Sequence, residues 1–150
     1  MFKYLVKKFH KWYGWKIIGD FPTDTPKYIV IGGPHTTNWD FFKALFGIYE
    51  KNEKVTILGK KELFRPPFGW VFRALNVIPV ERKKNSNAVD ATVEIFNQHD
   101  KLVIGLSPEG TRSKTKRLRT GFYHIARKAN IPLVMIGVNY ANRTMEIAPP

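Results

Sequence analysis

The sequence predicts an α/β fold: a single three-layer domain with a mixed, largely parallel sheet flanked by helices. Three observations lead to this prediction. Short runs of β-branched and apolar residues alternate with stretches of helical periodicity. The length of 150 residues is close to the commonest size of one domain. The 43% of apolar residues, with 11 Phe, 6 Tyr and 4 Trp, supply material for one core.

Residues 1–18 are expected to form a basic amphipathic helix that precedes a single domain over 19–150, and the sequence shows no repeats and no domain linkers. The apolar face of this helix can pack on the domain or lie in a membrane interface, and both alternatives stay open. Lysines near the N-terminus interrupt the apolar segment that a secretory signal needs. The apolar side carries Phe2, Leu5, Val6, Phe9, Trp12 and Tyr13, and the polar side carries Lys3, Lys7, Lys8 and Lys11.

The first half of the domain begins with a strand, a helix and a second strand. A β-branched run at 28–31 predicts a buried strand that stops at a Gly-Gly-Pro turn. Asn38 can cap a helix over 39–50, with an aspartate in its first turn. The run at 55–58 predicts the next strand.

The middle of the chain predicts two further helices separated by a short strand. A Pro-Pro step can open a helix over 66–75, and an apolar run at 77–80 follows it. Ser86 or Asn87 can cap a helix that ends near Gln98, with apolar residues at helical spacing on one side.

The last third of the chain contains three apolar runs around one helix. The runs at 102–106, 132–138 and 144–147 predict strands, and the stretch over 121–128 is helical in pattern. Asn130 is a residue type that ends helices. The chain stops soon after the last run, which leaves open whether a C-terminal element is missing.

The composition limits the classes of partner. With 25 Lys+Arg against 12 Asp+Glu the net charge is +13, so the partners expected are nucleic acid, an anionic membrane or a phosphorylated molecule. No apolar stretch approaches the roughly 20 residues that span a bilayer. The absence of cysteine excludes disulfides, a thiol nucleophile and a cysteine zinc site, and fits a reducing compartment.

Residues that can carry chemistry follow the run at 28–31. His35 lies in a Gly/Pro turn, and Asp40 stands five residues on, at a predicted helix start. The carboxylate can hold one imidazole nitrogen while the other faces a substrate, as in general-base catalysis. Because no serine or cysteine nucleophile accompanies the pair, the base would activate a hydroxyl of the substrate itself. Taken alone, this pair is more commonly explained as a histidine in a turn beside an aspartate that caps a helix.

A second group follows the run at 102–106. Gly110 allows backbone N–H groups to approach a ligand, Thr111 offers a hydroxyl, and the guanidinium of Arg112 matches a phosphate. The lysines and arginines further along this loop are also explained as a solvated basic surface. A third charged cluster occupies 60–65 and 81–84, where it can serve the same anion or keep the surface soluble.

In their order and spacing these motifs resemble the glycerolipid acyltransferases of the lysophosphatidic acid acyltransferase type. The His-x4-Asp block of that family is matched by residues 35–40, and its second block by 59–64 and 78–82. The Pro-Glu-Gly-Thr-Arg-Ser block is matched by 108–113, and the Ile/Val-Pro strand by 131–134. The blocks cover about two-thirds of the chain.

The resemblance implies transfer of a fatty acyl group from an acyl thioester, either acyl-CoA or acyl carrier protein, to the free hydroxyl of a lysophospholipid such as 1-acylglycerol-3-phosphate. His35 corresponds to the general base of the family and Asp40 to the carboxylate that orients it. Glu81, Ser107 and Met135 depart from the family pattern and leave the acceptor open. The positions that bind the acceptor are matched by Arg82, Glu109, Gly110, Thr111 and Arg112.

No metal and no cofactor beyond the acyl donor is expected, because a thioester is already activated and no residues have ligand spacing. The basic surface suits an acidic donor and an anionic membrane, so we expect a cytoplasmic protein bound peripherally at the cytoplasmic face. Two alternatives stay open. A nucleic-acid-binding module fits the pI near 10 but lacks a recognition motif, and a hydrolase can use His35 and Asp40 on water.

Overall fold

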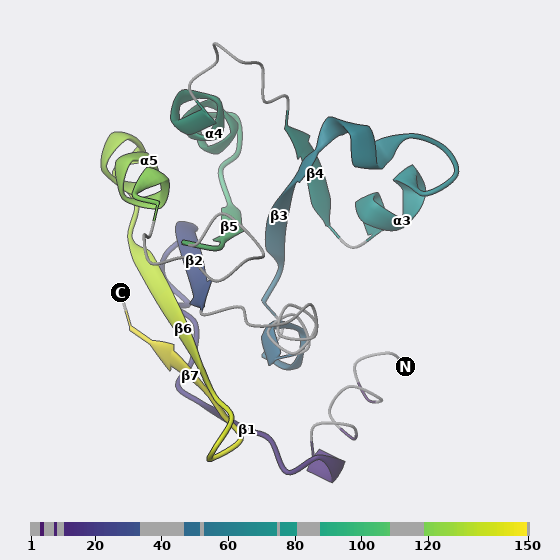
Figure 1. The fold of residues 1–150 in the computed structure, drawn as a ribbon. Helices are drawn as coiled ribbons and strands as arrows, with labels where there is room; N and C mark the ends of the chain where they lie inside the picture. The colour runs from purple at the N-terminus through teal and green to yellow at the C-terminus, as the bar shows by residue number, and fades with distance from the viewer. Residues whose placement is uncertain are drawn as a thin grey trace.

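A computed structural model describes most of the chain and centres on a mixed β-sheet (Figure 1). The described residues are 4, 8, 11–33, 47–51, 53–74, 76–80, 88–108 and 119–149. The strands are β1 (Lys16–Ile18), β2 (Lys27–Gly33), β3 (Val55–Lys60), β4 (Val77–Val80), β5 (Leu102–Leu106), β6 (Leu133–Asn139) and β7 (Thr144–Ala148). The helical elements are the 3-10 helix η1 (Lys61–Phe64) and the α-helices α3 (Gly69–Ala74), α4 (Ala88–Asn97) and α5 (Gly121–Ala129), and residues 47–50 are also helical.

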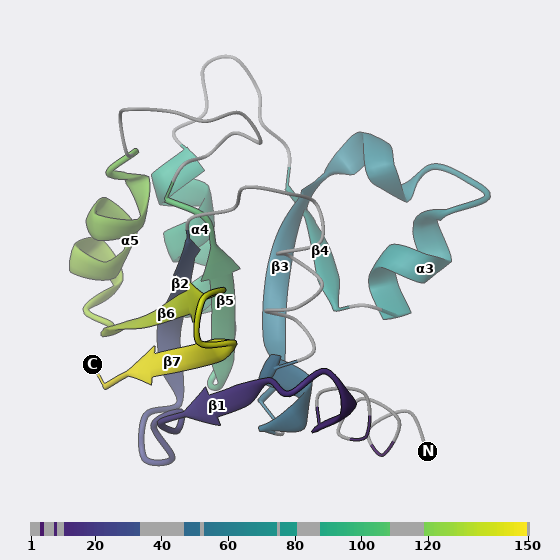
Figure 2. The same ribbon diagram turned by 60° about the horizontal axis from the view of Figure 1, so that its bottom comes forward.

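Within the described residues the sheet has seven strands, in the order β1-β7-β6-β2-β5-β3-β4. The five strands from β6 to β4 run parallel, so their carboxyl ends lie along one edge of the sheet (Figure 2). At the other side β7 is antiparallel to β6, and β1 is parallel to β7. The prediction of an α/β fold with a mixed, largely parallel sheet is confirmed.

Apolar side chains cover both faces of the sheet because successive residues of a strand point to opposite faces. Val30 belongs to one buried cluster, which includes Ile48 from the helical turn at 47–50. Ile29 belongs to the other, together with Phe96 of α4 and Ile125 of α5. Figure 1 shows α4 and α5 side by side, and a Lys128–Asp90 ion pair of 2.6 Å joins them. Helices on both faces give three layers.

The expected strands are confirmed, and each begins and ends within two residues of its predicted bounds. The helices expected near 87–98 and over 121–128 are present as α4 and α5. Asn130 ends α5 in a left-handed conformation with φ 53°, as its residue type predicts. The expected caps Asn38, Ser86 and Asn87 lie outside the described residues, as does most of the helix expected over 39–50.

The N-terminal segment differs from its prediction at its end. Residues 16–18 were expected to be helical, but they form β1 and pair with β7. Gly14 has a positive φ of 70°, which turns the chain, and the backbone N–H of Lys16 donates to the Arg143 carbonyl over 2.9 Å. Tyr4, Lys8, Lys11 and Trp12 have helical conformations, while the other residues up to 10 lie outside the description, so the amphipathic helix stays a prediction over that length.

The helix expected over 66–75 is shorter than predicted. Residues 61–64 form η1, the chain then turns, and α3 begins only at Gly69. Two successive prolines supply no N–H groups, so the first hydrogen bonds of the helix come after them. The N–H of Val71 donates to the Phe68 carbonyl over 3.0 Å.

Gly105 marks a close approach between β5 and β3, and its substitution tests the packing of the sheet. A Cβ at Gly105 would lie 2.9 Å from Val55 Cγ1, whereas a Cβ at Gly137 in β6 would meet nothing within 4 Å. We expect Gly105→Ala to lower the free energy of unfolding by about 1–2 kcal/mol through overpacking. Gly137→Ala, the matched control, should be neutral or slightly stabilising. Urea unfolding measures both, and equal midpoints for the two variants would contradict this packing.

Candidate active site

The predicted site residues follow the carboxyl ends of neighbouring parallel strands. In open α/β sheets this is the edge where ligands bind. The segment 34–46 follows β2, 81–87 follows β4, and 109–118 follows β5. The structure describes the points where these segments begin, whereas the site residues themselves lie outside the described residues. These residues are His35, Asp40, Arg82, Glu109, Gly110, Thr111 and Arg112.

The ends of β2 and β5 are in contact. The two strands pair in parallel register, with Ile31 opposite Leu106. A Cβ added to Gly33 would lie 3.5 Å from Pro108 Cγ, an ordinary van der Waals distance. Gly33 stands two residues before His35, and Pro108 directly precedes Glu109. The two segments that carry most of the predicted chemistry therefore start side by side.

The two residues that flank the segment 109–118 are hydrogen-bonded to each other. The backbone N–H of Arg119 donates a hydrogen bond of 2.7 Å to the carbonyl of Pro108. This bond joins the two ends of the segment 109–118 beside the end of β2. The residues that flank the predicted phosphate-binding segment, Pro108 after β5 and Arg119 two residues before α5, are thus bonded to each other.

Ser107 provides a buried hydroxyl at the same place. Its Oγ is shielded from solvent and has no hydrogen-bond partner among the described residues. A buried hydroxyl normally donates or accepts at least one hydrogen bond, so this group is available to the segments that begin here. Sequence reasoning noted Ser107 only as a departure from the family pattern and did not assign it a role.

The strand that leads to Arg82 is held by a residue that sequence reasoning missed. Asn76 adopts a positive φ of 58° and donates from Nδ2 to the Val55 carbonyl over 3.1 Å and to Thr56 Oγ1 over 2.9 Å. Its own carbonyl accepts from the N–H of Ile57 over 3.1 Å. These bonds fix the start of β4 against β3. An asparagine directly before an apolar run was the available signal, since asparagine tolerates this conformation.

Among the described ionisable groups, Tyr28 is the one with a clearly shifted pKa. Burial, and secondarily the charge of the Glu53 carboxylate, raise the pKa of Tyr28 well above its ordinary value. The Tyr28 hydroxyl has no hydrogen bond of ordinary geometry with a described residue, so it stays neutral within the core. Among the described residues no cluster of His, Asp or Glu can hold a metal ion. None of the described helices is long and apolar enough to cross a membrane.

Comparison with known proteins decides the family. The model of the Acyltransferase family matches residues 19–139, well over half of the chain. This chain therefore belongs to the acyltransferase family. The matched range contains all the predicted site residues and the strands β2 to β6. The family resemblance predicted from the motifs is confirmed.

Relatives of this acyltransferase share the name 1-acyl-sn-glycerol-3-phosphate acyltransferase. The protein from Cocos nucifera is 36% identical over 85 residues, which are 53% of this chain and 28% of the relative. The Escherichia coli K12 protein is 26% identical over 142 residues, 90% of this chain and 57% of the relative. The Saccharomyces cerevisiae protein is 29% identical over 132 residues, 83% of this chain and 42% of the relative. The chain thus spans between 28% and 57% of their lengths, and no solved structure matches it.

Proposed function

We propose that this acyltransferase moves a fatty acyl group from an acyl thioester to the free hydroxyl of a lysophospholipid such as 1-acylglycerol-3-phosphate. The observation that carries the proposal is the contact between the ends of β2 and β5 at Gly33 and Pro108. Because of this contact, the segment that carries the proposed base begins next to the segment that carries the proposed phosphate ligands. The shared name of the relatives supports the same acceptor.

The proposed chemistry is one proton transfer coupled to one acyl transfer. His35 accepts the proton of the acceptor hydroxyl while that oxygen attacks the thioester carbonyl. The carbon–sulfur bond of the resulting tetrahedral intermediate breaks, and the imidazolium returns the proton to the leaving thiolate. Asp40 holds the tautomer of the imidazole and stabilises its charged form. No metal is required, because the thioester is already activated.

The acceptor phosphate is assigned to the segment after β5 and to the end of β4. Arg112 and Arg82 supply guanidinium groups that bind phosphate oxygens through paired hydrogen bonds. Glu109, Gly110 and Thr111 belong to the same proposed acceptor site. The hydrogen bond from Arg119 to Pro108 supports this assignment because it joins the two residues that flank the segment, next to the end of β5. The donor, acyl-CoA or acyl carrier protein, is acidic and suits a chain of net charge +13.

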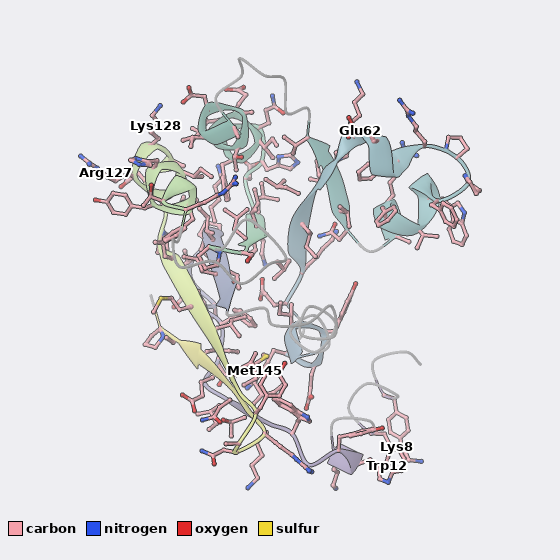
Figure 3. All side chains as sticks on the ribbon, in the orientation of Figure 1. Lys8, Trp12, Glu62, Arg127, Lys128 and Met145 are labelled. Carbon is pink, nitrogen blue, oxygen red and sulfur yellow. The ribbon has the colours of Figure 1, made fainter. Side chains whose placement is uncertain are left out.

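The site of action in this proposal is an anionic membrane surface on the cytoplasmic side. Tyr4 and Trp12 are 71% and 80% exposed, so these two aromatic side chains do not pack on the domain. Lys8 and Lys11 are exposed on the same segment, and Figure 3 shows Lys8 and Trp12 away from the sheet. Exposed aromatics next to lysines are typical of segments that lie in a membrane interface.

Substitution of the proposed base and its partner tests the mechanism. We expect His35→Ala to lower kcat by about a hundredfold or more, the usual scale of general-base catalysis. Asp40→Asn should also be severe, because an amide cannot stabilise the imidazolium. The double variant should lose little more than either single variant, since both residues serve one proton transfer. Steady-state kinetics with purified protein measures all three.

His99 offers a matched control for this experiment. It lies just after α4, where its Nδ1 is 2.8 Å from the Ile95 carbonyl, and it is exposed. His99→Ala should keep the turnover of the parent protein. Near-normal turnover in a folded His35→Ala protein would contradict the mechanism.

Arg112 tests the assignment of the acceptor phosphate. Arg112→Lys keeps the positive charge but loses the paired donors of the guanidinium. We expect the KM for the acceptor to rise by about tenfold, roughly one strong hydrogen bond, while the KM for the donor changes little. Arg127→Lys, on the exposed side of α5, is the matched control. An equal rise in both KM values for Arg112→Lys would assign this residue to the donor or to the fold instead.

A further inference from the structure

A compact segment of residues 61–74 projects from the sheet between β3 and β4. It consists of η1, a turn and α3, and Figures 1 and 2 show it extending beyond the edge strand β4, away from α4 and α5. Because β3 and β4 are parallel, the segment starts at the carboxyl end of β3, the edge of the proposed active-site segments, and returns through α3 to the amino end of β4.

The segment has a small core of its own. The rings of Phe64 and Phe72 lie 6.0 Å apart, and the guanidinium of Arg73 lies 5.9 Å from the centre of the Phe64 ring. Gly69 is buried, and a Cβ there would overlap the Phe64 carbonyl, so α3 sits directly on η1. The N–H of Phe68 donates to the Arg65 carbonyl over 3.2 Å and closes the turn. This packing holds the segment in one shape.

Two other aromatic side chains of the segment point into solvent. Phe68 is 64% exposed and Trp70 is 71% exposed, although Phe64 and Phe72 are partly buried on the inside. Large apolar side chains exposed together on a well-ordered element indicate a binding surface rather than loose packing. Because the inner pair already fills the small core, the outer pair is not needed for it.

The same segment carries basic side chains. The segment 61–74 contains Lys61, Arg65 and Arg73 against the single acid Glu62, and all four are exposed. Tryptophan and phenylalanine flanked by arginine and lysine are the residues that bind the headgroup region of a bilayer. Figures 1 and 2 show the segment extending outward from the sheet, which suits contact with a flat lipid interface.

We propose that this surface, formed by Arg65, Phe68, Trp70 and Arg73, binds the interface of an anionic lipid bilayer as a second contact beside the N-terminal segment. Contact here would bring the bilayer to the side of the sheet bounded by the edge strand β4, whose carboxyl end leads to Arg82. The proposal goes beyond the acyl-transfer function and does not depend on it, because membrane binding needs no donor and no turnover.

Vesicle binding without acyl donor tests the role of the two exposed rings. The double variant Phe68→Ser with Trp70→Ser is compared with the parent protein on sucrose-loaded vesicles of phosphatidylcholine and phosphatidylglycerol. We expect its partition coefficient to fall about tenfold or more, because two large apolar side chains no longer enter the interface. Tyr123→Ser removes an exposed aromatic of α5 and should leave binding unchanged. Equal binding by the double variant and the parent would overturn the proposal.

Arginine substitutions separate lipid charge from apolar contact. Arg65→Gln and Arg73→Gln should each weaken binding to the mixed vesicles about fivefold, the effect of one basic residue near an anionic surface. Binding to vesicles of phosphatidylcholine alone should stay the same. Arg127→Gln serves as the control on α5. Unchanged salt dependence and affinity in both variants would overturn the assignment to anionic lipid.

Two further measurements keep the outcome unambiguous. Thermal unfolding must give the same midpoint for the Phe68→Ser/Trp70→Ser protein as for the parent. If the midpoint of the double variant falls, the single variant Trp70→Ala is used in its place. Analytical ultracentrifugation reports self-association, and a dimer of the parent that the variant abolishes would assign the surface to a second copy and overturn the proposal. His35→Ala should bind vesicles like the parent, so failure of the catalytic mechanism leaves this test intact.

Discussion

The parallel pairing of β2 with β5 is the constraint on which the rest of the molecule depends. Ile29 and Ile104 face each other in this pairing, and both are fully buried. Because side chains of β2 enter both buried clusters, the same strand holds the helices of each face. The pairing also sets the contact of Gly33 with Pro108, from which the proposed base and the proposed phosphate ligands follow in the chain. Core stability and the layout of the site thus have one origin.

Much of the fold could be predicted from local pattern, because buried parallel strands are continuous apolar runs and the run at 102–106 is one of them. β1 could not be predicted in this way, since its three residues are too few to show a hydrophobic pattern and its conformation depends on pairing with β7. The turn before α3 depends on the packing of α3 against η1, and the conformation of Asn76 depends on its hydrogen bonds to β3. For the site, motif spacing predicted which segments carry chemistry, but the contact between their starting points depends on strand order, which no local pattern contains.

The proposed site and the adjoining segment 61–74 combine two kinds of recognition. The segments after β2, β4 and β5 carry the residues proposed for proton transfer and for phosphate, while the segment after β3 presents apolar rings and arginines. An acceptor that lies in a bilayer offers its phosphate and hydroxyl at the surface. A protein held at the bilayer by the proposed contacts would therefore meet the reacting groups without extracting the lipid. The net charge of +13 suits the proposed approach to an anionic bilayer and the proposed acidic donor.

The most direct test of the account is the identity of the product. Purified protein is incubated with a long-chain acyl-CoA and vesicles that contain 1-acylglycerol-3-phosphate, and mass spectrometry follows the lipids while a thiol reagent follows the released CoA. The account predicts a diacylglycerol phosphate formed in equal amount to the free thiol, and no thiol release when the acceptor is left out. Free fatty acid formed in place of the diacyl lipid, at a rate independent of the acceptor, would show hydrolysis and contradict the account.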